Sequence, residues 1–330
     1  MRQNNIFLML LKVFFFSSIL VATSAVRAEL KVVTTIKPLH SLIANVMDGV
    51  GEPALIIEGS TSPHSFTLKP SHAKLLEEAD IIFWVGESIE TFMERPLESI
   101  VKNAEVVEFM EVESINKLKF REESIFEDHD DHDDHDDHDD HDDHDDHDDH
   151  DDHDDHDDHD DHDDHSGHDH HGHAHGEFDA HIWLDPMNAK EMVHEIAHEL
   201  GDLDPANKNK YEANAQATIQ ALDQLVNDIE KGINKDAKFV VFHDAYQYFE
   251  ERFGVRSAGA LTLNTDVLPG AKQIADIQDV IKDRGIKCIF SEPQFNPKII
   301  TTIAEDMNIK TGVFDPLGAN IDSNKDLYFK

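Results

Sequence analysis

Cysteine is almost absent from this chain of 330 residues, since Cys288 is the only one. A single thiol cannot form a disulfide within these residues, so we expect it either to be buried and inert or to pair with a cysteine beyond Lys330. Long apolar runs are equally scarce. After the first 28 residues no stretch is long enough to cross a bilayer, which argues against stable membrane insertion.

The one long apolar stretch lies at the start of the chain, from Ile6 to Ala22, after the basic Arg2 and before the small-residue ending at Ala28. This pattern is typical of a secretory signal peptide, so we predict export and removal of residues 1–28. No cysteine near the cleavage point could accept a lipid anchor. The sequence therefore favours free release into a periplasm.

Basic residues are also few: 28 lysines and arginines stand against 70 acidic residues, for a net charge of −42. Such a field repels phosphates and argues against nucleic acid as a partner. Much of the acidity comes from one segment, 128–175, which repeats Asp-Asp-His and holds all but seven of the 25 histidines. It lacks the apolar residues needed to offset the entropy of ordering, so we interpret it as a disordered insertion.

Repeated imidazoles flanked by carboxylates would supply many weak metal sites at high local concentration. One hypothesis is that the insertion collects or buffers zinc for a tighter site. The other is that the repeat expanded during replication and is tolerated because it is solvated. The candidate auxiliary ligands in it are His129, His132, His165, His168, His170, His171, His173 and His175.

Outside the insertion, short apolar runs alternate with amphipathic segments, which predicts two α/β lobes, each with a small parallel sheet flanked by helices. The expected strands are Lys31–Ile36, Ala54–Ile57, Ile81–Val85, Glu105–Phe109, Lys238–Phe242, Val255–Leu261, Cys288–Phe290 and Thr311–Phe314. The expected helices are Leu39–Met47, Pro70–Glu78, Ile89–Val101, Ala245–Phe253, Gly270–Arg284 and Lys298–Met307.

One long amphipathic segment connects the lobes. We expect Asp204 to cap it and Pro205 to begin it, and apolar residues then recur every three or four positions up to Ile233. This predicts a rigid linker helix of roughly 40 Å. The chain then divides into a signal peptide (1–28), an N-terminal lobe with the insertion (29–203), the linker helix (204–233) and a C-terminal lobe (234–330).

Four potential metal ligands occur in or near loops that follow predicted strands. His64 follows the predicted strand that ends at Ile57, and His243 directly follows Phe242. Asp315 directly follows a strand ending at Phe314, and His181 lies just beyond the insertion. Ligands of open α/β sheets bind at the carboxyl ends of strands. Three imidazoles with a carboxylate or a water suit a tetrahedral Zn²⁺ site.

A second pattern, from His194 to His198, matches the HExxH motif of zinc proteases. The apolar residues around it form one stripe, and at 100° per residue both histidines point to the opposite face. Gly201 is an ordinary helix terminator. We therefore interpret the segment as the exposed face of a structural helix, and we expect no enzymatic activity.

The segment Ser62–Ser71, with its Ser-Pro-His-Ser-Phe sequence, resembles the first metal-ligand loop of the zinc-uptake solute-binding proteins of ABC transporters. Further segments are similar to that family and occur in its order along nearly the whole mature chain. They are Ile36–His40, Asp179–Pro186, Phe242–Tyr246, Ser291–Phe295 and Asp315–Gly318.

The resemblance implies that His64, His181 and His243 bind the metal. Some members place an acidic ligand just before the first histidine, but this chain has Pro63 there, so Asp315 or a water must complete the shell, and we favour Asp315. Manganese-selective relatives place a glutamate where His243 stands, which indicates zinc here. Glu292, which follows a strand, is a candidate outer partner.

The resemblance also implies function: a monomeric, high-affinity receptor that captures periplasmic Zn²⁺ and delivers it to an inner-membrane ABC permease. The alternatives are a receptor for manganese or another divalent metal, a periplasmic zinc buffer, and a protease. Family members continue past the Asp315 loop into a closing helix that often carries a cysteine. This comparison predicts that the C-terminal lobe is truncated and that Cys288 has its partner in the missing part.

Overall fold

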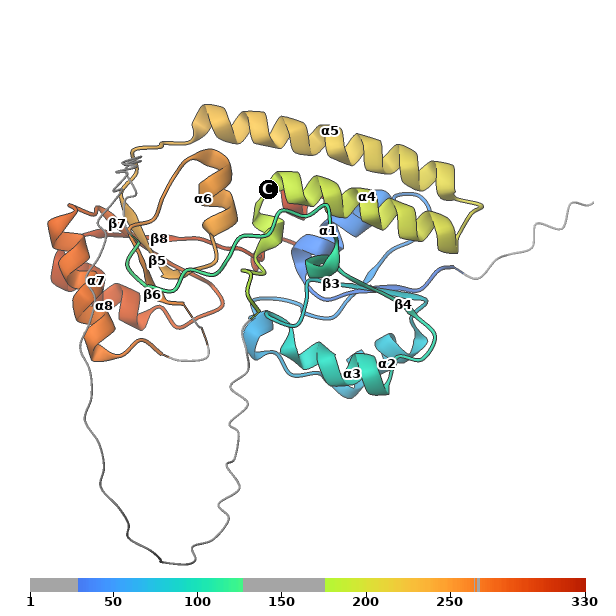
Figure 1. Cartoon of the computed structure of the whole chain (residues 1–330), viewed down its shortest axis with the longest axis horizontal. Coiled ribbons are helices and arrows are strands. Elements are labelled where there is room, and N and C mark those ends of the chain that lie inside the picture. Colours follow the sequence, from blue (N-terminus) through green and yellow to red (C-terminus); the bar gives the residue numbers. More distant parts are fainter. Residues whose placement is uncertain (1–28, 127–175, 264, 266–267) are drawn as a thin grey trace, which may run out of the picture.

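The computed structural model describes residues 29–126, 176–263, 265 and 268–330, and within them it forms two α/β lobes joined by one long helix (Figure 1). Each lobe is built on a parallel four-stranded sheet with helices against it. The predicted fold class is therefore confirmed. The predicted signal peptide and the whole predicted insertion lie outside the described residues.

The N-terminal sheet has the strand order β2-β1-β3-β4. Its central strand β3 is fully buried, because helices cover both faces of this parallel sheet. The strands are β1 (Val32–Thr34), β2 (Ala54–Leu55), β3 (Ile81–Trp84) and β4 (Glu105–Glu108). The helices of this lobe are α1 (Lys37–Val46), α2 (Pro70–Glu78), α3 (Glu94–Ser99) and α4 (Pro186–Leu203), with short 3₁₀ turns η1 (Pro63–Ser65), η2 (Thr91–Met93), η3 (Phe109–Glu111) and η4 (Ile182–Leu184).

The C-terminal sheet has the matching order β6-β5-β7-β8. Side chains alternate across it, so Val240 and Phe242 join the core with α7 and α8, whereas Phe239 and Val241 belong to the cluster on the other face. The elements are β5 (Phe239–His243), α6 (Gln247–Phe253), β6 (Ala260–Thr262), α7 (Ala271–Asp283), β7 (Cys288–Ser291), α8 (Lys298–Met307), β8 (Lys310–Val313) and the 3₁₀ turn η5 (Leu327–Phe329).

The second face of this sheet borders a cavity of about 920 Å³ whose lining includes Phe239, Phe290, Phe314 and Cys288. The thiol of Cys288 is free and only partly buried. Cys288 thus forms part of an apolar wall.

The linker helix α5 spans Lys208–Gly232 and runs along the top of the view from one lobe toward the other (Figure 1). The predicted start at Pro205 is wrong, because Asp204 ends α4 and its carboxylate accepts hydrogen bonds from Asn207 (2.6 Å) and Tyr211 (3.2 Å). The buried apolar residues of α5 belong to the core of the N-terminal lobe. At 1.5 Å per residue α5 is about 37 Å long.

Two other elements are shorter than predicted. The helix expected over Ile89–Val101 is regular only from Glu94, because Pro96 has no N–H and its ring excludes the carbonyl four residues earlier. The strand expected from Val255 begins at Ala260, because Ser257 gives its N–H and hydroxyl to the Glu250 carboxylate.

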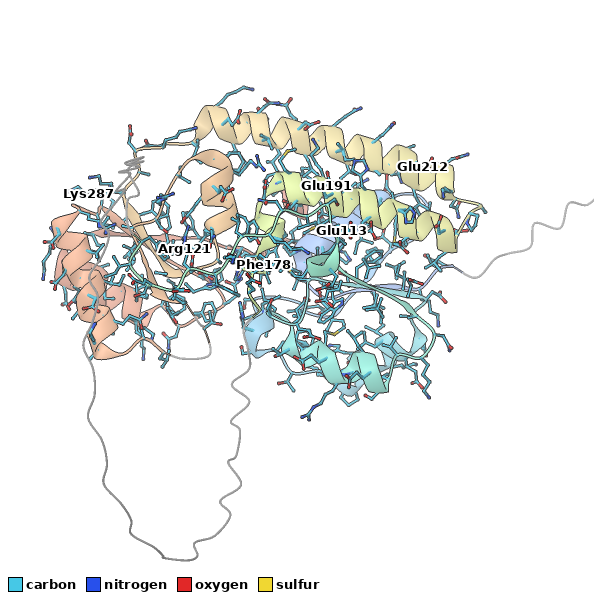
Figure 2. All side chains as sticks on the ribbon, viewed as in Figure 1. Glu113, Arg121, Phe178, Glu191, Glu212 and Lys287 are labelled. Atoms are coloured by element: carbon cyan, nitrogen blue, oxygen red, sulfur yellow. The ribbon has the colours of Figure 1, made fainter. Side chains whose placement is uncertain are left out.

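The segments that flank the insertion diverge. On one side Ile125 forms a bridge with Gly259 of the C-terminal lobe, and on the other Phe178 pairs with Lys119. Figure 2 shows Phe178 near the junction of the lobes, with Arg121 on the side of the C-terminal lobe. The chain that leads into the insertion is therefore attached to the C-terminal lobe, although it precedes the linker helix.

The end of the chain also crosses between lobes. The buried ammonium of Lys37 on α1 donates to the carbonyls of Gly318, Ala319 and Ile321 at 2.6, 3.2 and 2.6 Å. Turn η5 packs against α1, and the Tyr328 hydroxyl donates to a backbone carbonyl of the N-terminal lobe. Residues 318–330 therefore contact the N-terminal lobe, although the predicted C-terminal lobe, 234–330, includes them.

Candidate metal centre

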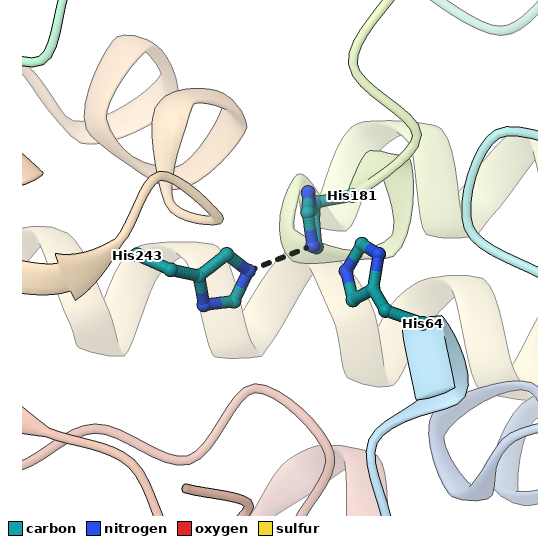
Figure 3. Close-up of side chains that lie close together, drawn as sticks. All are labelled: His64, His181 and His243. Carbon is teal, nitrogen blue, oxygen red and sulfur yellow. Dashed lines mark hydrogen bonds between the residues drawn. The ribbon is translucent and has the colours of Figure 1, made fainter. Parts of the chain in front are cut away.

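Three histidines from distant parts of the sequence meet between the lobes (Figure 3). One potential ligand atom from each of His64, His181 and His243 lies within 4.8 Å of the other two. The Nε2 atoms of His181 and His243 are 3.3 Å apart. This is the only such group of histidine, cysteine or acidic side chains in the described part of the chain. The structure thus brings together three of the four predicted ligands.

His64 is presented by the short turn η1. Pro63 fixes the backbone at the start of this turn, and the Ser62 hydroxyl accepts a hydrogen bond from the His64 N–H (3.3 Å). The half-buried ring of His64 lies 5.5 Å from the ring of His181 and 5.7 Å from that of His243, between centroids.

His181 is buried and stands immediately before the turn η4. Its Nδ1 lies 2.7 Å from Oδ1 of Asp179, and its backbone N–H donates to the same oxygen at 2.9 Å. Burial raises the pKa of Asp179 to about 7, although the His181 N–H acts in the other direction. Burial, with the nearby His243, holds the pKa of His181 well below 6.5. The imidazole of His181 is therefore neutral, which is the form that binds a metal.

His243 is the last residue of β5, and Glu292 follows β7 next to it in the sheet. The Nδ1 of His243 donates to both carboxylate oxygens of Glu292, at 2.8 and 2.9 Å, because an ionised carboxylate can only accept. Burial opposes the charged imidazolium, but the Glu292 carboxylate outweighs it and raises the pKa of His243. The contact directs Nε2 toward the other two histidines.

The space enclosed at this point is small. A cavity of about 10 Å³ is lined by the three histidines together with Trp183, Phe295 and Leu317, among others. One water needs about 10–15 Å³ of such volume, so an organic ligand is excluded from this cavity. The arrangement suits a single ion.

Asp315 does not join the histidines. Its carboxylate accepts hydrogen bonds from Nε2 of Gln294 (2.9 Å) and from the backbone N–H groups of Leu317 (3.3 Å) and Ala319 (2.6 Å). These contacts hold the loop that follows β8, which also lines the cavity through Pro316 and Leu317. In this arrangement Asp315 shapes the wall of the site.

The HExxH segment lies on α4, away from this centre. His194 and His198 are exposed, while Met192, Val193 and Ile196 of the same helix are buried. The prediction that both histidines face away from the core is confirmed. The predicted auxiliary histidines between His129 and His175 lie outside the described residues.

Asp179 was not predicted from the sequence as a functional residue, whereas Glu292 was considered as an outer partner. Both carboxylates hold the Nδ1 of a histidine, an arrangement that fixes the ring orientation of metal ligands. The available signal was the Asp-Ala-His spacing, which lets Asp179 reach both the ring and the backbone of His181. For Glu292 the only signal was its position after a strand, because it is 49 residues from the histidine that it contacts.

Two parallel-sheet lobes, a long connecting helix and three histidines around an ion-sized cavity define a metal-binding solute-binding protein. Residues 32–330 match the family model of ZnuA, the periplasmic component A of a zinc-uptake complex. The chain belongs to this family, so the resemblance noted in the sequence is confirmed. No helix among the described residues is both long and apolar enough to pass through a bilayer.

Relatives support the same assignment. The chain is 49% identical over 299 residues to the high-affinity zinc uptake system protein ZnuA of Brucella abortus (strain 2308), covering 90% of this chain and 86% of the relative. It is 32% identical over 314 residues to ZnuA of Yersinia pestis, covering 94% and 91%.

Solved structures share the fold. A crystal structure of ZnuA superposes with a TM-score of 0.68 at 20% identity, covering 91% of this chain and 95% of that one. The solute-binding protein FpvC of Pseudomonas aeruginosa, in complex with Mn²⁺, superposes with a TM-score of 0.66 at 21% identity, covering 91% and 92%.

Proposed function

We propose that this receptor binds one Zn²⁺ ion through His64, His181 and His243 and delivers it, as a monomer, to an ABC permease of the inner membrane. The observation that carries the ligand set is the 3.3 Å between the Nε2 atoms of His181 and His243. Two nitrogens bound at 2.0–2.1 Å to one tetrahedral Zn²⁺ lie about 3.4 Å apart. Zinc titration of alanine variants, argued in the Discussion, tests it.

The metal cannot be chosen from the fold, because FpvC has the same fold and its structure holds Mn²⁺. The identity of the metal is instead indicated by the donor atoms. Imidazole suits zinc, copper and nickel, whereas Mn²⁺ prefers carboxylate, carbonyl and water oxygens. The carboxylate of Glu292, which contacts His243, is engaged by Nδ1. A set of three imidazoles therefore favours Zn²⁺ over Mn²⁺, which a competition titration between the two ions would test.

The fourth ligand in this proposal is a water molecule in place of Asp315, whose oxygens already accept three hydrogen bonds. We expect Asp315→Ala to weaken zinc binding by less than about tenfold, the lower limit typical of outer partners of a metal site. Chelator competition measures the dissociation constant, with His64→Ala as the matched loss of a ligand. If both variants lost the same affinity, Asp315 would be the fourth ligand.

The insertion is proposed to add capacity and to leave the tight site unchanged. Deletion of residues 128–175 should lower the number of zinc ions bound per chain while one tight site keeps its dissociation constant. The reason is that none of the three convergent histidines lies in the deleted range. Equilibrium dialysis counts the ions. Loss of the tight site in the deletion variant would show that the insertion supplies its ligands.

A further inference from the structure

Helix α6 connects two of the proposed metal ligands that come from opposite lobes. It begins at Gln247, four residues after His243, so β5, His243 and α6 form one continuous unit of the C-terminal lobe. The same helix contacts the segment of the N-terminal lobe that carries His181. A single rigid element thus reaches both sides of the centre.

The first contact lies on the N-terminal side of His181. The hydroxyl of Tyr248 donates to the carbonyl of Asp179 at 2.5 Å and accepts from the N–H of Leu118 at 3.0 Å. Tyr248 is only 1% exposed and belongs to the hydrophobic core of the N-terminal lobe, although α6 belongs to the other lobe. Asp179 in turn holds the ring of His181. Tyr248 therefore supports the residue that orients this ligand.

The second contact lies on the C-terminal side of His181. Arg252 forms a two-pronged ion pair with Asp185: Nε and Nη2 each donate to one carboxylate oxygen at 2.7 Å. Asp185 is 2% exposed, ends the turn η4 and caps α4 by accepting from the Met187 N–H (2.9 Å). Paired, charge-assisted hydrogen bonds of this kind fix geometry as well as adding energy.

Tyr248 and Arg252 are four residues apart and so lie on the same face of α6. They hold the two ends of the short segment from Asp179 to Asp185, with His181 between them. We propose that Tyr248 and Arg252 are positioning residues that set His181 relative to His243, so that the two imidazoles are in place before the ion arrives. This inference rests on the proposed ligand set.

The consequence is kinetic. A ligand held from both ends cannot swing away easily, so loss of Arg252 should speed zinc dissociation more than it slows association. We expect Arg252→Met to raise the zinc dissociation constant by about tenfold, as removal of outer partners of a metal ligand does. Arg252→Lys keeps the charge but not the two-pronged geometry, so its dissociation constant should lie between those of the native protein and of Arg252→Met. Tyr248→Phe should act in the same direction as Arg252→Met.

The test is a double-mutant cycle on the full chain with Arg252→Met, His181→Ala and both together. Zinc is buffered with a competing chelator, and binding is followed by the fluorescence of Trp183, whose ring lies 5.3 Å from that of His181. Lys190→Met is the matched control, because it removes another ion pair of α4, with Asp223 at 2.8 Å, that does not reach α6. Circular dichroism checks that each variant is folded.

We expect Arg252→Met to weaken binding in the native background and to have no further effect once His181 is absent. The control should leave zinc binding unchanged in both. An equal loss with and without His181, or no loss in the folded Arg252→Met and Tyr248→Phe variants, would overturn the inference. If His181→Ala alone bound zinc normally, the proposed ligand set would fail instead, so the two failures are distinguishable.

Discussion

Replacing His64, His181 or His243 by alanine should each weaken the tight zinc site by more than about 100-fold, because even the loss of an outer partner of a metal ligand typically costs 10- to 100-fold. The three side chains converge on one small cavity, and no fourth protein ligand joins them there among the described residues. A shell that keeps only two imidazoles cannot hold Zn²⁺ tightly. Competition against a chelator of known affinity measures the loss.

His72→Ala is a suitable control for these variants. His72 lies on α2, where its Nδ1 accepts the N–H of Lys69, and it is outside the three-histidine group. Its replacement should leave zinc affinity unchanged. Normal zinc binding by His243→Ala would contradict the assignment most clearly, because that histidine is the only one of the three supplied by the C-terminal sheet.

Lowering the pH from about 7.5 to 5 should weaken zinc binding by more than about 30-fold. Zinc binds neutral imidazole, so a proton on any ligand competes with it. The raised pKa of His243 means that this proton must be displaced already above the ordinary value of 6.5, and each unit below the pKa costs about tenfold. Burial lowers the pKa of His181, so this histidine adds less of such a cost than His243 does.

Isothermal titration at several pH values measures the affinity and the protons released. Glu292→Gln provides the matched comparison, because it removes the carboxylate that raises the pKa of His243. In that variant the fall in affinity should begin at a lower pH, in addition to any loss from poorer orientation of the ring. Affinity independent of pH between 7.5 and 5 would be incompatible with a shell of histidines.

Much of this fold is predictable from the sequence because strands and helices alternate with distinct periods. All eight predicted strands occur, and helices α2 and α8 have the predicted bounds. The errors arise where a side chain competes with regular structure. The Asp204 carboxylate accepts a hydrogen bond from Asn207, and the linker helix begins only after that residue. The Glu250 carboxylate accepts the N–H of Ser257, and β6 begins three residues later. Such tertiary bonds leave no periodic signal.

The metal site also has features that the sequence predicts and features that it does not. His243 could be placed from its position after an apolar strand, and His64 and His181 from their motifs. The contacts between the lobes could not be predicted from the sequence. Lys37 and the carbonyl of Gly318 are 281 residues apart, and Arg252 and Asp185 are 67 residues apart. Asp315 was favoured as a ligand on its position after β8. Its hydrogen bonds to Gln294 and Ala319 depend on the conformation of the following loop, which the residue order does not reveal.

The most direct test of the ligand set is to locate the metal. Crystals of the zinc-loaded protein, with diffraction recorded above and below the zinc absorption edge, would show its position through anomalous scattering. We predict one strong peak between the lobes, at about 2.0–2.1 Å from a ring nitrogen of each of His64, His181 and His243, with a water as fourth ligand. A fully occupied zinc peak elsewhere, with these three histidines unbound, would contradict the account.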